Sequence, residues 1–234
     1  MAPHAPYTAS VELFRLAKHC SEELGMPFTT HIAESLDEHE MFLEGRGELY
    51  DFLSKLGRNM DDCGHGSPLS HLMEFGLLNE RCLAVHLNYL QEYDLAHLRQ
   101  YPLNIVHCPQ CHDYFGHRRF PLEDVERTGC KVMIGTDSLA SNHSLDLRSE
   151  IRHAAREYPG IGSRDWLHKV TSIPAEALGM ENQLGVIQPA ALADLVAFSL
   201  PDSRLPEDPY RYIIESTQTP DFILVNGVQT DLKL

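Results

Sequence analysis

The stretch of sequence that decides the fold runs from Cys82 to His107 and reads CLAVHLNYLQEYDLAHLRQYPLNIVH. It begins with an apolar run, CLAVH, continues through a segment with helical spacing, QEYDLAHLRQ, and ends with a second apolar run, LNIVH. Strands that are covered on both faces read as short continuous apolar runs, often with β-branched residues. The stretch therefore predicts two parallel strands joined by a helix, and each strand ends in a histidine, His86 or His107.

The same alternation of apolar run and helical segment continues on both sides of this stretch. Before it, PFTTHI carries His31 next to its end, and an acidic helical segment follows from about Ser35 to Leu56. After it, PLEDVERTG gives a helix, KVMIGTD ends at Asp137, and LDLRSEIRHAAREY gives the next helix. Four successive strand-helix units predict an α/β fold with a parallel sheet and right-handed crossovers. In such folds the ligand site lies at the carboxyl ends of the strands, so we expect the polar residues there to converge on one rim.

Beyond about Met180 the sequence changes to short β-like runs that are broken by Gly, Pro and Asp. Two such runs, GVIQPAALADLVAFSL and DFILVNGVQTDLKL, flank a Pro- and Asp-rich segment, PDSRLPEDPY, that we expect to be a loop. We therefore expect a main α/β part over residues 1–180 and a small β module over residues 181–234 that packs on it.

The composition is that of an ordinary globular protein and argues against several functional classes. The chain has 234 residues, of which 43% are hydrophobic and 23% are charged, and its net charge is −15. An acidic chain disfavours nucleic acids and anionic membranes as partners, because phosphate groups select basic surfaces. No apolar run is long enough to span a membrane and no secretory signal opens the chain, so we expect a cytoplasmic protein with a small-molecule substrate. Six cysteines in such a chain are most simply reduced thiols.

The candidate catalytic groups lie at the predicted strand ends. His31 and Asp137 offer an imidazole nitrogen and a carboxylate oxygen, which suit a divalent metal such as zinc, although a core histidine and a helix-capping aspartate give the same pattern. Glu34 could move a proton between a metal-activated water and a leaving group, or could be an acid in the first turn of a helix. His86 and His107 could bind the metal, orient the attacking water, or be buried and hydrogen-bonded.

The segment CPQCH, from Cys108 to His112, carries a separate pattern. C-x-x-C-H is the pattern of covalent haem attachment, and a cysteine pair after a strand is also compatible with a dithiol redox site or a structural zinc site. Covalent haem requires export, for which the chain shows no signal, and Pro109 breaks the strand at this point. We interpret the two cysteines as neutral thiols at the rim of a pocket.

Five motifs in a fixed order resemble the amidohydrolase superfamily. They are HAPYTAS (4–10), THIAES (30–35), LAVHLNYL (83–90), VHCP (106–109) and GTDSLASN (135–142). The nearest branch is similar to the cyclic deaminases, among them the methylthioadenosine/S-adenosylhomocysteine, guanine and aminofutalosine deaminases. The tail LGVIQPAALADLVAF, with ILVNG as a last strand, resembles the C-terminal β segment of that family. The resemblance implies the C-terminal portion of a (β/α)8 TIM-type barrel, with residues 1–180 supplying about strands 4 to 8 and residues 181–234 a β-sandwich segment.

The resemblance also implies a role for each matching residue. His31 and Asp137 would bind one divalent metal ion, zinc before others, and Asp137 would also be the catalytic base toward the attacking water. Glu34 would be the catalytic proton shuttle, and His86 would contact the attacking water. His4, Glu34 and His86 would bind the substrate. The implied reaction is metal-dependent hydrolytic deamination of an aminated N-heterocycle, such as a purine nucleoside derivative.

Two departures from the family pattern leave alternatives open. Cys111 and His112 stand where the family usually has a serine-asparagine pair, which indicates a different pocket wall. The His-x-His pair of the family's first strand is missing, so the chain resembles a piece that begins at the fourth strand. The alternatives are another amidohydrolase reaction, namely dechlorination or cyclic amide hydrolysis, and a catalytically incomplete fragment. An open half-barrel would leave two bare strand edges, for which we expect poor solubility or a homo-oligomer.

Overall fold

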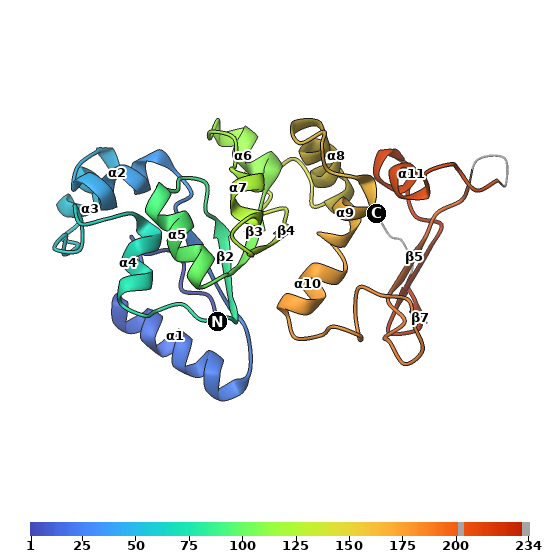
Figure 1. Cartoon of the computed structure of the whole chain (residues 1–234), viewed down its shortest axis with the longest axis horizontal. Coiled ribbons are helices and arrows are strands. Elements are labelled where there is room, and N and C mark those ends of the chain that lie inside the picture. Colours follow the sequence, from blue (N-terminus) through green and yellow to red (C-terminus); the bar gives the residue numbers. More distant parts are fainter. Residues whose placement is uncertain (201–203, 231–234) are drawn as a thin grey trace. The chain divides into compact units, whose positions relative to one another are not determined.

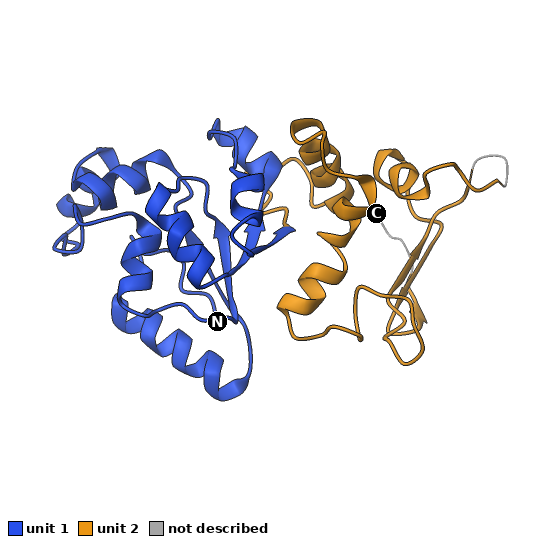
Figure 2. Ribbon diagram, viewed as in Figure 1, with its two compact units in different colours: residues 1–133 blue, residues 134–234 orange. Residues whose placement is uncertain are grey.

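A computed structural model gives the structure of the chain and describes residues 1–200 and 204–230. The chain divides into two compact units, residues 1–133 and residues 134–234 (Figure 2). The sequence instead predicts a domain boundary between residues 180 and 181, at the start of the C-terminal β segment. That boundary stays a prediction. Within the described residues, no helix combines the length and the apolar character that a membrane crossing requires.

The first unit is built on a parallel sheet, as the sequence predicts. Its strands follow the order β1-β2-β3-β4, so each strand lies beside the next strand in the chain. Pairing is parallel from β1 to β2 and from β2 to β3, and Ile32 at the end of β1 stands opposite His86 at the end of β2. Within the described residues these strands do not close into a barrel. The bounds are β1 (Phe28–Ile32), β2 (Cys82–His86), β3 (Asn104–His107) and β4 (Lys131–Ile134).

Helices follow the strands in the predicted alternation (Figure 1). The segment after β2 is helical as predicted, and Pro109 occupies the first turn of the helix after β3, where its missing N–H costs nothing. Apolar side chains between the sheet and these helices are buried, among them Phe28, Ala84 and Ile105. The helices of this unit, other than those between residues 35 and 56, are α1 (Val11–Leu24), α4 (Pro68–Glu74), α5 (Glu92–Gln100), α6 (Pro109–Phe115) and α7 (Leu122–Glu126).

The acidic segment from about Ser35 to Leu56 is helical as predicted, but its helix is interrupted. The structure has two helices there, α2 (Leu36–Glu44) and α3 (Glu48–Lys55). Gly45 and Gly47 lie between them with φ values of 64° and 108°, a conformation that glycine adopts at low cost and that ends a helix. The acidic character of the segment is the same in both helices, so it gave no signal of the break.

The second unit contains helices and a small antiparallel sheet. Strands β5 (Leu195–Ala197), β6 (Phe222–Val225) and β7 (Val228–Gln229) pair in the order β5-β6-β7 and fall within the two predicted β-like runs. The predicted loop over 201–210 lies partly outside the described residues, and its end is helical, because Asp208 caps helix α11 (Pro209–Glu215). The other helices are α8 (Leu147–Glu157), α9 (Ser163–His168) and α10 (Ser172–Ala177).

Candidate active site

The backbone is strained where β1 and β2 end. Ala33 directly follows β1 with φ at 52°, His86 ends β2 with φ at 76°, and Leu87 follows with φ at 51°. Residues other than glycine rarely adopt this left-handed backbone conformation, and those that do concentrate at functional sites. Two hydrogen bonds fix the turns to each other, from the Leu87 N–H to the Ile32 carbonyl at 2.9 Å and from the Asn88 N–H to the Ala33 carbonyl at 3.0 Å.

Four imidazole rings form a row across these strand ends. The ring centroids of His4 and His31 are 5.1 Å apart, those of His31 and His86 are 5.1 Å apart, and those of His86 and His112 are 5.4 Å apart. We call these four residues the histidine row. The structure thus brings together His4, His31 and His86, which the sequence analysis names as site residues, and adds His112, which the sequence placed only in a pocket wall; their catalytic roles stay predictions.

The backbone of His4 sets the tautomer of His31. The His4 carbonyl accepts hydrogen bonds from the His31 N–H at 2.8 Å and from His31 Nδ1 at 3.0 Å. A carbonyl only accepts, so Nδ1 carries the ring proton and Nε2 presents a lone pair. Metal-binding histidines commonly have their second ring nitrogen fixed in this way, so His31 fits a zinc ligand. The same hydrogen bonds cover part of the outer edge of β1, which is one of the two strand edges that we expected to be unpaired.

Glu34 lies beside the row, on a turn that a second glutamate fixes. Glu34 Oε1 is 3.6 Å from His86 Nε2. The Glu38 carboxylate accepts the main-chain N–H groups of Ala33 at 2.9 Å and Glu34 at 2.8 Å. Burial raises the pKa of Glu38 to about 8, against the opposing effect of those two N–H groups. Sequence reasoning missed Glu38, although Ser35-x-x-Glu38 ahead of a helix is a capping-box pattern.

The interior side of the row is buried and contains a thiol. His86 is fully buried, and burial together with the neighbouring histidines lowers the pKa of His86 well below its usual value, so its ring is neutral at pH 7. A ring nitrogen of His86, a carboxylate oxygen of Glu34 and Cys111 Sγ all lie within 4.8 Å of one another. Cys111 is fully buried as well, and no disulfide joins any of the six cysteines.

The two remaining strand-end residues have different surroundings. His107 is buried and its ring stacks on Phe120 with centroids 4.4 Å apart, so it packs in the core beside the row. Asp137 lies three residues beyond β4, has φ at 56°, and accepts the Ser138 N–H at 2.7 Å. His31 and His86 belong to the first unit and Asp137 to the second, so the structure describes the two parts of the predicted metal site separately.

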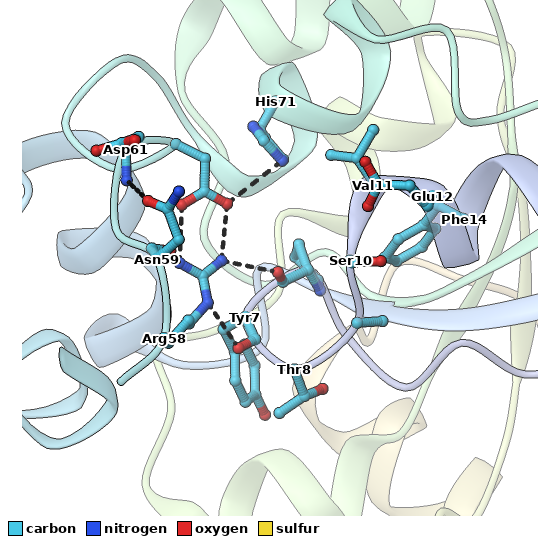
Figure 3. A pocket seen from close by; sticks show the side chains of 13 residues that line it. Tyr7, Thr8, Ser10, Val11, Glu12, Phe14, Arg58, Asn59, Asp61 and His71 are labelled. Atoms are coloured by element: carbon cyan, nitrogen blue, oxygen red, sulfur yellow. Dashed lines mark hydrogen bonds and ion pairs between the residues drawn. The ribbon is translucent and has the colours of Figure 1, made fainter. Parts of the chain in front are cut away.

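A second polar cluster binds the main chain of the segment that directly follows His4. Arg58 donates from Nε to the Tyr7 carbonyl at 3.0 Å and from Nη2 to the Pro6 carbonyl at 3.2 Å, and it forms a bidentate pair with Asp62 at 2.7 Å for both contacts (Figure 3). We call Arg58, Asp62 and these two carbonyls the Arg58 network. It lines a cavity of about 390 Å³, and His71 Nε2 approaches Asp62 at 3.8 Å.

Comparison with known proteins identifies the family of the chain. The sequence pattern of the amidohydrolase family matches residues 1–230. The chain belongs to the amidohydrolase family. A 5-methylthioadenosine/S-adenosylhomocysteine deaminase of Pyrococcus furiosus is 33% identical to this chain over 207 residues, covering 86% of this chain and 45% of the relative. An aminodeoxyfutalosine deaminase of Deinococcus radiodurans is 30% identical over 174 residues, covering 70% of this chain and 41% of the relative.

Solved structures show the same fold. An adenosine deaminase from Xanthomonas campestris with bound zinc matches with a TM-score of 0.78 and 26% identity over 97% of this chain and 50% of its own. Aminofutalosine deaminase of Helicobacter pylori matches with a TM-score of 0.85 and 20% identity over 99% of this chain and 58% of its own. The chain spans about half the length of the curated relatives it matches.

Proposed function

We propose that this chain provides the strand-end half of a hydrolytic deaminase site for an aminated N-heterocycle of the purine nucleoside class. The observation that carries the proposal is the approach of Glu34 Oε1 to His86 Nε2 at 3.6 Å, next to the ring of His31. A carboxylate and a neutral imidazole beside a metal-competent histidine are the groups that hydrolytic removal of an amine requires. The names of the Pyrococcus and Deinococcus relatives support the substrate class.

His31 and Asp137 would hold a divalent metal ion. The Nε2 lone pair of His31 supports this assignment, and an adenosine deaminase of the same fold contains bound zinc. When bound, such an ion lowers the pKa of a water and so supplies the nucleophile at neutral pH. Zinc as the ion and a single ion per site are parts of the proposal.

The remaining steps fall to side chains of the chain itself. Asp137 accepts the proton that the attacking water gives up as its oxygen bonds to the ring carbon that bears the amino group. Glu34, in its protonated form, gives its proton to the adjacent ring nitrogen. Asp137 then passes the proton of the water to the amine, which leaves as ammonia, and Glu34 takes up the proton that the new hydroxyl group loses as it becomes a carbonyl. His86, neutral and fixed by its buried position, steadies the tetrahedral intermediate through its ring nitrogen. The exposed ring of His4 contacts the substrate at the mouth of the site.

Ammonia release in the presence of added zinc tests the proposal. We expect the chain to release ammonia from 5-methylthioadenosine or adenosine and His31→Ala to lose the activity at least about a hundredfold. His19→Ala is the matched control, because His19 is a surface histidine of α1 with a 63% exposed side chain, and it should keep full activity. Failure of the unsubstituted chain to release ammonia, or full activity in His31→Ala, would contradict the proposal. Homo-oligomerisation and a cytoplasmic location stay predictions.

A further inference from the structure

We propose that Cys111, His86 and Glu34 form a second metal site, specific for a thiophilic divalent ion such as cadmium or zinc. This site differs from the His31 and Asp137 pair, and it needs residues of the first unit only. Its three donors come from three separate elements: Glu34 from the turn after β1, His86 from the end of β2, and Cys111 from α6.

The spacing of the three donors suits one ion. Their ligand atoms lie within 4.8 Å of one another. In a tetrahedral zinc site with bonds of about 2.0–2.3 Å, neighbouring ligand atoms are about 3.3–3.8 Å apart. A contraction of about 1 Å therefore completes the site. Glu34 can provide it, because its side chain is 20% exposed while His86 and Cys111 are fully buried on rigid elements.

His86 Nε2 provides an independent reason to place a ligand here. Among the described residues this buried atom has no hydrogen-bond partner, and its nearest charged neighbour is Glu34 Oε1 at 3.6 Å. A buried polar atom without a partner is costly, so such an atom in a folded protein points to a missing ligand. His86 Nδ1 is 3.3 Å from His112 Nε2. When Nδ1 donates to His112, Nε2 presents a lone pair on the side of Glu34.

The charges of the three donors select a divalent ion. A dication in a buried site is stable when its ligands neutralise it, because uncompensated buried charge is expensive. The Glu34 carboxylate and the Cys111 thiolate together carry two negative charges, while His86 is neutral. As the sulfur-metal bond forms, the thiol proton leaves to solvent. Sulfur is a soft ligand, so this set favours cadmium and zinc over magnesium or calcium.

Occupation of this site has a consequence that rests on the proposed function. Glu34 and His86 would be bound to the ion and could no longer move protons or steady the intermediate. Excess zinc or cadmium should therefore inhibit ammonia release, and Cys111→Ser should relieve the inhibition. The thiol would make the site a sensor of thiophilic metal.

Absorption spectroscopy of the full chain tests the proposal without any activity assay. We expect cobalt(II) or cadmium(II) to produce a thiolate-to-metal charge-transfer band with about one ion per chain. Cys111→Ser should lose the band and bind cadmium at least about a hundredfold more weakly. Cys108→Ser is the matched control, because Cys108 is also buried and lies one helical turn away, yet it is not among the three donors; it should keep the band.

Two further variants keep the outcomes distinct. Glu34→Gln, at a partly exposed position that tolerates substitution, should keep the charge-transfer band but weaken cadmium binding about tenfold. His31→Ala should keep the band while losing ammonia release, which separates failure of this site from failure of the proposed deaminase. Absence of the band in the unsubstituted chain, or its persistence in Cys111→Ser, would overturn the proposal.

Discussion

The histidine row and the Arg58 network both involve the short segment from His4 to Tyr7, but their side chains differ in charge and in hydrogen bonding. The carbonyl of His4 accepts two donors of His31, while the carbonyls of Pro6 and Tyr7 accept donors of Arg58. The Arg58 network uses permanent charges that pair with each other. The histidine row uses rings of which at least one, His86, has a buried nitrogen without a hydrogen bond among the described residues. The comparison teaches that a satisfied cluster stabilises a fold, whereas an incompletely satisfied cluster is available for a ligand.

The largest effect should come from the side chain beside the histidine row. Glu34→Gln removes a proton-transfer group, so the rate of ammonia release should fall by about 10²–10⁴-fold while the melting temperature stays nearly unchanged. Glu23→Gln, at an exposed position of α1, is the control and should behave like the original chain. A large loss of stability in Glu34→Gln would show that Glu34 stabilises the fold, and it would contradict the proton-transfer role.

The Arg58 network should give the largest effect on stability. Arg58→Ala leaves Asp62 without its bidentate partner and the main-chain carbonyls of Pro6, Tyr7 and Asn59 without their donor. Urea denaturation should therefore show a loss of about 2–3 kcal/mol, below the cost for a fully buried pair because both side chains are partly exposed. Arg58→Lys keeps the charge but cannot form the bidentate pair, so it should lose about half as much. Arg127→Ala, at a pair exposed to solvent, should change stability by less than about 0.5 kcal/mol.

As the pH falls, stability should be lost first through the buried His39 and only at lower pH through Asp62 of the Arg58 network. Burial lowers the pKa of His39 below 6.5, so the unfolded chain binds the proton first and stability is lost as the pH falls below 6.5. For Asp62, burial opposes ionisation, but hydrogen bonds from Arg58 outweigh it and lower its pKa below 3.8, so its contribution is lost only below that pH. In His39→Gln the slope of the unfolding free energy between pH 6.5 and 5 should decrease by up to about 1.4 kcal/mol per pH unit.

The smallest effect concerns thiol reactivity. Burial raises the pKa of Cys63, in contact with Arg58, to about 12, and burial also raises the pKa of Cys82 and Cys130. Cys20 is the least buried of the six cysteines. A thiol reagent at pH 8 should therefore modify Cys20 within minutes and the others only after denaturation. Mass spectrometry of digested samples identifies the modified residues, and rapid labelling of Cys63 would mean that the Arg58 network opens readily.

The sequence predicted those features that depend on local pattern. Apolar runs with His31 and His86 at or next to their ends predicted both strands and the approach of these two side chains, because parallel strands end at one edge. The break at Gly45 was readable from its glycines but was outweighed by the acidic pattern around it. The positions of Cys111 and His112 depend on how α6 turns after β3, which spacing alone does not set.

Other contacts leave no pattern in the sequence at all. Arg58 binds main-chain carbonyls of Pro6 and Tyr7, and any residue type can supply a carbonyl. Glu38 binds main-chain N–H groups, and only its distance from Ser35 hinted at this. The metal pairing of His31 with Asp137 rests on family resemblance, because the two residues belong to different compact units.

The left-handed backbone at Ala33, His86 and Leu87 costs conformational energy at each of the three residues. Glycine adopts such torsion angles without the steric penalty that other residues carry. Ala33→Gly would relax its turn at the loss of one methyl group, whereas His86→Gly would also leave a cavity where a fully buried imidazole stands. Stabilisation of this chain by directed evolution should therefore begin at Ala33 and keep His86 under selection for turnover.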